Sequence, residues 1–204
     1  ATNACLALSD LTANPPQWAD RNDDVVDRQA VAIMGTCLVL LRCSREIDVI
    51  DPYLFNHADL SRYRPVLKTL IQYASQGPGC SPLTSLRVHT FADNYTSQTL
   101  LDGLKNGEFH QGLGIPSGLC VRVDIWNSGG AQDSPHARYL LTELAGIRVD
   151  AGFDEHRRGT TDISRVSCEV RLRRLNEFRR SGYPYRHRGA VEFDGSGQYR
   201  LFFL

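Results

Sequence analysis

Lysine is almost absent from this 204-residue chain, which carries it only at Lys68 and Lys105. The remaining 21 of its 23 basic residues are arginines. The 23 acidic residues bring the formal net charge to zero, which argues against a globally basic, histone-like nucleic-acid binder. A composition of 42% hydrophobic and 23% charged residues excludes a disordered or collagen-like chain. The length favours one domain, over residues 23–204, with an N-terminal arm at residues 1–22 and an arginine-rich C-terminal portion.

Long hydrophobic runs and metal-type cysteine patterns are missing as well. The most apolar stretch, Val31–Leu41, is eleven residues long, too short to span a bilayer, and the first residues lack the basic start of a secretory signal. The six cysteines form no Cys-x-x-Cys pair and have no histidine at metal-ligand spacing, which is typical of reduced, mostly packed thiols. We therefore expect a cytoplasmic protein without a transmembrane segment, metal ion or cofactor.

The zero net charge is the sum of two uneven halves. Residues 1–59 have a net charge of −5, whereas residues 156–188 have a net charge of +7. The arginines of this basic segment, interleaved with Phe178, Tyr183 and Tyr185, are Arg157, Arg158, Arg165, Arg171, Arg173, Arg174, Arg179, Arg180, Arg186 and Arg188. Guanidinium groups bind phosphate and aromatic rings stack on bases, so the segment suits nucleic acid or an anionic headgroup surface. The alternative is a solvated face with salt bridges to the acidic N-terminal part.

Hydrophobic periodicity predicts an α/β fold in which a mixed β-sheet is flanked by helices. Helical spacing occurs in four segments: Asp23–Arg42, Leu60–Ala74, Gln98–Gln111 and Arg173–Arg180. Seven segments have strand character: Ile47–Tyr53, Leu86–Phe91, Leu119–Trp126, Ala137–Glu143, Ile147–Asp150, Val166–Leu172 and Tyr199–Phe203. Strands separated by helices imply parallel pairing, and the later short connections imply antiparallel edges.

The segment with the strongest chemical pattern runs from Ser134 to Glu143. On a strand, His136 and Arg138 are two residues apart and point to the same face. An imidazole can attack or protonate a phosphate, while a guanidinium neutralises its non-bridging oxygens. Glu143, seven residues after the histidine, is a candidate for the carboxylate that orients the imidazole.

This spacing resembles the His-x-Lys-x4-Asp signature of the phospholipase D superfamily, with Arg138 in place of the lysine and Glu143 in place of the aspartate. The run that ends in Asp51-Pro52-Tyr53 resembles the strand that opens many phospholipase D-like lobes. The resemblance covers about residues 25–165. Because the superfamily's active site uses two histidines, from two lobes or from a dimer, it implies a single lobe here, acting as a homodimer or as a subunit of a larger complex.

A closer resemblance is to the degenerate phospholipase D-like domain at the C-terminus of MIT-domain proteins. It rests on His136-x-Arg138, then a Gly-Ile strand at residues 146–147, then Gly-Phe-Asp at residues 152–154. This resemblance implies that the fold is kept and the hydrolytic motif lost. It also implies a basic surface for phospholipid headgroups and a dimer.

Three functions follow as hypotheses. The first is a non-catalytic domain that binds a phosphodiester or other polyanion, preferably nucleic acid, in a bacterial DNA-handling or phage-defence system. The second is a dimeric, metal-independent phosphodiesterase or nuclease with His136, Arg138 and Glu143 as catalytic residues. The third is a structural protein-interaction subunit. The candidate ligand-binding residues are Asp51, Tyr53, Arg138, Asp154, Arg157 and Arg158.

Simpler interpretations accompany these residues. His136 can be a polar residue at the edge of a strand, and Asp51 and Tyr53 can belong to an ordinary strand terminus. His89 lies on a predicted strand, where we expect a half-buried core histidine.

Overall fold

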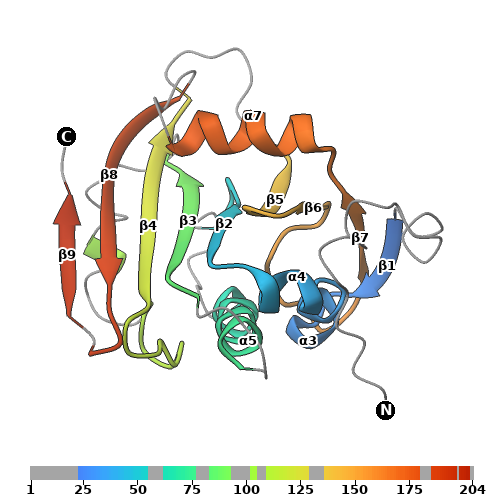
Figure 1. The fold of residues 1–204 in the computed structure, drawn as a ribbon, viewed down its shortest axis with the longest axis horizontal. Helices are drawn as coiled ribbons and strands as arrows, with labels where there is room; N and C mark the ends of the chain where they lie inside the picture. The colour runs from blue at the N-terminus through green and yellow to red at the C-terminus, as the bar shows by residue number, and fades with distance from the viewer. Residues whose placement is uncertain are drawn as a thin grey trace.

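The computed structural model describes residues 23–54, 62–76, 83–92, 102–104, 109–128, 136–179, 185–196 and 198–202. The expected arm at residues 1–22 lies outside this range. The described chain forms one nine-stranded mixed sheet with helices on both faces (Figure 1). The predicted α/β fold with a mixed sheet flanked by helices is confirmed.

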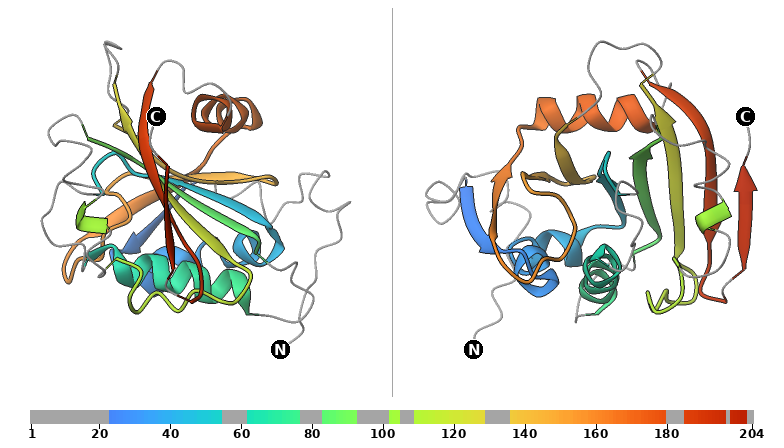
Figure 2. Two further views of the ribbon diagram at one scale, coloured as in Figure 1. Left: turned by 90° about the vertical axis from the view of Figure 1, so that its left-hand side faces the viewer. Right: turned by 180° about the vertical axis from the view of Figure 1, so that it is seen from behind.

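The sheet has the strand order β1-β7-β6-β5-β2-β3-β4-β8-β9. Its strands are β1 (Asp23–Asp27), β2 (Glu46–Ile50), β3 (Ser85–Phe91), β4 (Cys120–Asn127), β5 (Arg138–Thr142), β6 (Gly146–Val149), β7 (Thr160–Arg165), β8 (Arg186–Phe193) and β9 (Tyr199–Phe202). The central strands β2, β3 and β4 are parallel, and all other pairs are antiparallel. The sheet has the usual strong twist (Figure 2).

One face of the sheet is covered by α3 (Ala30–Gly35), α4 (Leu38–Cys43) and α5 (Arg64–Ser75), drawn below the sheet in Figure 1. Helix α5 starts with Pro65 in its first turn, where the missing N–H has no intrahelical acceptor to lose. Its buried residues recur at helical spacing and pack on the main core: Val66, Leu67, Leu70, Ile71 and Ala74. These contacts fix the N-terminal end of α5 close to the end of β2.

Among the described helices, α7 (Cys168–Arg179) covers the other face (Figure 1). Phe178 of this helix packs against Phe91, Trp126 and Tyr185, whose ring centroids lie 5.4–6.1 Å from its own. Phe178 and Tyr185 are both buried, so the interpretation in which their rings alternate with arginines to stack on bases is wrong for these two residues. Tyr183 lies outside the described residues.

Two predicted elements are wrong, the first because sheet pairing overrides local periodicity and the second because the chain there turns into helix α7. Asp23–Asp27, predicted as the first turn of a helix, is strand β1 and pairs antiparallel with β7. The helical part of that segment is divided into α3 and α4 near Thr36. No strand forms at Val166–Leu172. The strand of this region, β7, lies earlier, at Thr160–Arg165, and helix α7 begins at Cys168.

Two other segments differ from their predictions. Strand β8 was absent from the prediction, since its sequence Arg-His-Arg-Gly begins with no apolar alternation. Of the helix predicted at Gln98–Gln111, the described residues 102–104 are helical and 109–111 form bends and turns.

The cysteines are less buried than expected. Cys37 is buried and Cys120 partly so, but Cys43 and Cys168 are exposed, and none of these four described cysteines forms a disulfide; Cys5 and Cys80 are not among the described residues. In the described ranges no helix is long and apolar enough to cross a membrane.

Candidate functional site

The site begins at Asp51, immediately after the C-terminal end of the central parallel strand β2. Its carboxylate is fully buried and accepts two backbone N–H groups, from Tyr53 at 2.9 Å and from Phe153 at 3.1 Å. Burial raises the pKa of Asp51 to about 6, against the lowering effect of these two hydrogen bonds and of the Arg138 charge. A carboxylate at this position joins the end of β2 to the loop after β6.

Arg138 reaches Asp51 because β5 runs antiparallel to β2, with Ile50 opposite Tyr139. Its Nε lies 3.9 Å from Oδ1 of Asp51, an ion pair without a direct hydrogen bond. Its Nη1 donates to the carbonyl oxygen of Asp150 at 2.6 Å, and its guanidinium carbon lies 4.6 Å from the ring centroid of Tyr53. The guanidinium is therefore held in one place while 23% of the side chain stays exposed.

His136 lies on the solvent side of this arrangement. Its Nδ1 is 2.5 Å from the hydroxyl oxygen of Tyr53, and the two rings are nearly parallel. The backbone carbonyl of Tyr53 accepts a hydrogen bond from the buried hydroxyl of Tyr63 at 3.1 Å. Tyr53 thus connects an exposed imidazole to Arg138 and is itself anchored from the core.

Gly152 lies at the centre of the charged groups. It has φ +95°, and a Cβ at this position would lie 3.2 Å from Oδ2 of Asp51 and 3.3 Å from Nε of Arg138. The next charged residue, Asp154, is buried and pairs with Arg28. Only a residue without a side chain fits between the two aspartates and the arginine at this φ.

Seven of the residues proposed from sequence come together or lie close by. His136, Arg138, Asp51 and Tyr53 are in contact, Asp154 adjoins them through Gly152, and the exposed Arg157 and Arg158 follow on the same loop. The structure does not bring Glu143 to this site. It lies beyond the opposite end of β5, where its carboxylate accepts the N–H groups of Arg45 and Glu46 at 2.6 and 3.2 Å.

The Glu143 carboxylate therefore cannot orient the His136 imidazole within this chain. In the described ranges the hydrogen-bond partner of His136 is the Tyr53 hydroxyl, a neutral group. His136 and Glu143 flank strand β5 (Arg138–Thr142) at its two ends, and because a strand extends about 3.3 Å per residue, its length separates them.

Two residues of the site have no signal in the sequence: Arg28 is 126 residues from its partner Asp154, and Tyr63 is a helix-flanking tyrosine among eight tyrosines. Gly152 belongs to the Gly-Phe-Asp motif at residues 152–154, but its place between Asp51 and Arg138 shows only in the fold. Burial raises the pKa of Tyr63, as do the nearby Asp51 and Asp154. Only the topology brings these residues to the end of β2.

A second charged cluster lies in the opposite layer, beneath α7. Nε2 of the fully buried His89 is 3.0 Å from Oδ1 of Asp48, and Nδ1 accepts the indole N–H of Trp126 at 3.2 Å. Arg179 of α7 donates to both oxygens of Asp48 and to Glu46. His89 is thus more deeply buried than the half-buried core histidine we expected.

The cluster continues along β4. Asp124 accepts hydrogen bonds from Arg122 at 3.0 Å and from His187 at 2.7 Å. Burial raises the pKa of Asp124, but the hydrogen bonds and charges of its neighbours outweigh this and hold the pKa below its usual value. The pKa of Asp48 is lowered in the same way by His89 and Arg179. With its carboxylates buried and paired, the cluster joins α7 to the sheet.

No group of three or more potential metal-ligating side chains gathers anywhere in the described ranges. Comparisons with models of protein families, with curated proteins and with solved structures give no match, so the site is interpreted from its own geometry.

Proposed function

We propose that the chain is a phospholipase D-like domain that binds a phosphodiester polyanion, preferably nucleic acid, without cleaving it. The observation that carries the proposal is the exposed His136–Tyr53–Arg138 contact above the buried Asp51. A guanidinium fixed by an aromatic ring, a carbonyl and a carboxylate is preorganised to bind a phosphate oxygen.

The position of the site supports the proposal. Ligands of open α/β sheets collect beyond the carboxyl ends of parallel strands, and Asp51 and Tyr53 directly follow β2. The resemblance in sequence to phospholipase D-like lobes concerns these same residues together with His136 and Arg138. The sites of that superfamily act on phosphodiesters, which is the chemistry proposed for this chain.

Among the described residues no carboxylate accepts a hydrogen bond from His136, and this favours binding over catalysis. A nucleophilic histidine gains basicity from a carboxylate on its second nitrogen, and here that nitrogen faces the Tyr53 hydroxyl. Arg138 also has a delocalised charge and donates hydrogen bonds in pairs, whereas the superfamily has the compact charge of a lysine at this position. Both features suit a site that holds a phosphate in its ground state.

The proposal is tested by fluorescence anisotropy with a labelled 20-nucleotide single strand at several salt concentrations. We expect the affinity to fall steeply with salt, by about 0.7 log units per phosphate contact for each tenfold rise in salt. Arg138→Ala should weaken binding by about tenfold, because it removes a charge-assisted phosphate contact.

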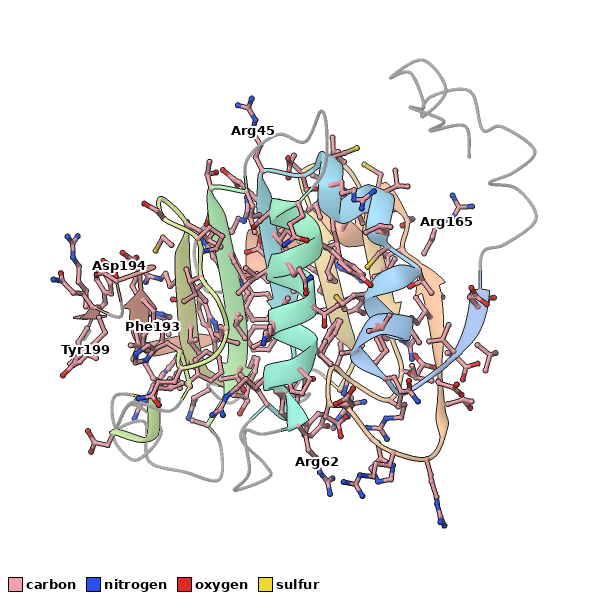
Figure 3. The ribbon with its side chains drawn as sticks, turned by 90° about the horizontal axis from the view of Figure 1, so that it is seen from below. Arg45, Arg62, Arg165, Phe193, Asp194 and Tyr199 are labelled. Atoms are coloured by element: carbon pink, nitrogen blue, oxygen red, sulfur yellow. The ribbon has the colours of Figure 1, made fainter. Side chains whose placement is uncertain are left out.

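The matched control is Arg45→Ala, which removes an exposed arginine at the end of the molecule opposite Arg62 (Figure 3). It should leave the affinity within about twofold of the wild type. Equal effects of the two substitutions, or salt-independent binding, contradict the proposal.

A dimeric phosphodiesterase remains the second candidate function because His136 is exposed and its Nε2 takes no part in the hydrogen bond to Tyr53. In that reaction Nε2 attacks phosphorus, the P–O bond to the leaving alcohol breaks, and water later hydrolyses the phosphohistidine. The test is turnover of a fluorogenic bis-phosphodiester, with acid-quench trapping of the phosphohistidine. Turnover abolished by His136→Ala and unaffected by chelators supports catalysis; no turnover and no trapped intermediate rejects it.

A further inference from the structure

A hollow lies beside the site, on the loop that follows Asp154. Its volume is about 660 Å³, and the described residues that line it all carry polar or charged groups: Gln29, Arg62, Glu155, His156, Arg157 and Arg158. Arg62 lies at the N-terminal end of α5, on the side of the molecule away from Arg45 (Figure 3). The hollow is therefore built from three segments that are distant in sequence: the β1–α3 junction, the start of α5 and the loop before β7.

The loop that carries two of its arginines is fixed by backbone hydrogen bonds. The N–H of Glu155 donates to the carbonyl oxygen of Arg62 at 2.8 Å, and the N–H of His156 donates to that of Arg28 at 2.7 Å. The Glu155 carboxylate accepts the N–H of Ala30 at 3.1 Å. These contacts hold the loop against the β1–α3 junction and leave Arg157 and Arg158 exposed to solvent.

The charges of the hollow are unbalanced, unlike those of the neighbouring site. At the site, Arg28 pairs with Asp154 and Arg138 with Asp51. In the hollow, Arg62, Arg157 and Arg158 face the single carboxylate of Glu155, and in the described part of the chain none of the three arginines has an acidic partner. The positive potential that attracts an anion therefore originates mainly in the hollow.

The site and the hollow adjoin each other. The guanidinium of Arg28 binds Asp154 next to Gly152, while the carbonyl of the same Arg28 accepts the N–H of His156. On the other side, Asp27, the last residue of β1, pairs with Thr160, two residues after Arg158, so an acidic residue lies opposite the end of the loop that carries the arginines. A bound anion that extends from the hollow is thus directed towards Arg138 and away from β1.

We propose that the hollow is a second anion subsite, which binds a phosphate next to the one held at Arg138. The ligand then carries at least two linked phosphates, as a nucleic-acid strand does. The polar lining favours a nucleic-acid strand over a membrane surface, because membrane docking uses apolar side chains that enter the lipid and the lining has none. This inference rests on the proposed function at Arg138.

The test measures affinity against ligand length, using thymidine 5′-monophosphate and 5′-phosphorylated oligothymidylates of two, four and eight nucleotides. For the wild type we expect a gain of roughly tenfold or more between the monophosphate and the tetranucleotide, since a second charge-assisted contact forms. Arg157→Ala/Arg158→Ala should lose most of this gain, because it removes two of the three arginines of the hollow, whereas Arg138→Ala should weaken binding of every ligand in the series. Both side chains are exposed, so the variant should fold, as its thermal unfolding can verify.

Arg45→Ala serves as the matched control and should keep the full gain with length. A gain with length that survives in the Arg157→Ala/Arg158→Ala variant overturns the second subsite. Binding of the monophosphate at Arg138 with no gain for longer strands also overturns it, while the proposed function stands. Absence of binding to every strand rejects the proposed function itself. Binding confined to phosphoinositide-containing vesicles, and lost in the same variant, overturns the choice of nucleic acid.

Discussion

At the scale of single residues, the site depends on a buried carboxylate that lowers the stability of the folded state. Asp51 is fully buried, and its ion-pair partner Arg138 is 3.9 Å away without a direct hydrogen bond. A buried charge with an incomplete partner destabilises the folded state at a pH where it is ionised. Such positions are retained where the charge orders a functional group, here the guanidinium of Arg138.

The raised pKa of Asp51 predicts a distinct pH dependence of stability. The folded protein holds this proton up to about pH 6, whereas the unfolded chain releases it near 3.8, so the free energy of unfolding falls as pH rises between these values. The full effect is about 3 kcal/mol. Asp51→Asn should remove this slope, as urea unfolding at pH 4.5 and 7 can measure. If the free energies of unfolding of variant and wild type differ by the same amount at both pH values, the raised pKa does not belong to Asp51.

Gly152 gives a second prediction at this scale, with Gly159 as its matched control. Both have positive φ, but a Cβ at Gly159 meets nothing within 4 Å, while one at Gly152 meets Asp51 and Arg138. Gly159→Ala should cost about 1 kcal/mol from backbone strain alone. Gly152→Ala should cost about 2–3 kcal/mol and also weaken anion binding. Equal losses in urea unfolding and unchanged binding would show that the close approach has no role.

At the scale of secondary-structure elements, α7 is attached to the sheet at both ends by arginines. Near its start, Nη1 of Arg171 donates to the carbonyl oxygens of Thr142 and Glu143 at 2.8 and 2.7 Å. At its end, Arg179 binds Asp48 and Glu46. These contacts explain why the basic segment of the sequence is only partly available for a ligand.

Arg179→Ala should therefore destabilise the fold. It leaves the buried Asp48 with His89 as its main partner, and breaking a buried ion pair costs about 3 kcal/mol, at the lower end of the usual range because Arg179 is partly exposed. Arg173→Ala, an exposed arginine of the same helix, should change the free energy of unfolding by less than about 0.5 kcal/mol. Similar effects of the two substitutions in urea unfolding would contradict this account of α7.

The elements also show what the sequence could predict. The strands next to Asp51 and His136 and the hairpin near Gly146 follow from short runs of β-branched and apolar residues, bounded by Pro52 and by Ala145-Gly146, and most of these residues are buried. Strand β1 and strand β8 carry polar or glycine residues and are strands because a neighbour pairs with them, a fact no local pattern contains. Arg28 and Tyr63 have no place in the sequence analysis for the same reason: no local pattern links them to their partners.

At the scale of the whole molecule, the zero net charge conceals a division of roles among the arginines. Some, such as Arg179, neutralise buried carboxylates, whereas Arg62, Arg157 and Arg158 stay exposed around one hollow. The charge count of the sequence located the basic segment, but only the fold separates structural arginines from those that can meet a ligand. We therefore expect polyanion binding at one edge of the molecule and not along the entire basic segment.

The most direct test is to titrate the ¹⁵N-labelled protein with an eight-nucleotide single strand and to follow its amide resonances. We predict that the amide resonances of Tyr53, Arg138 and residues 152–158 shift most, and that those of α7 and β9 change little. Shifts confined to α7, or no shifts at low salt, would contradict a phosphate-binding site at the end of β2.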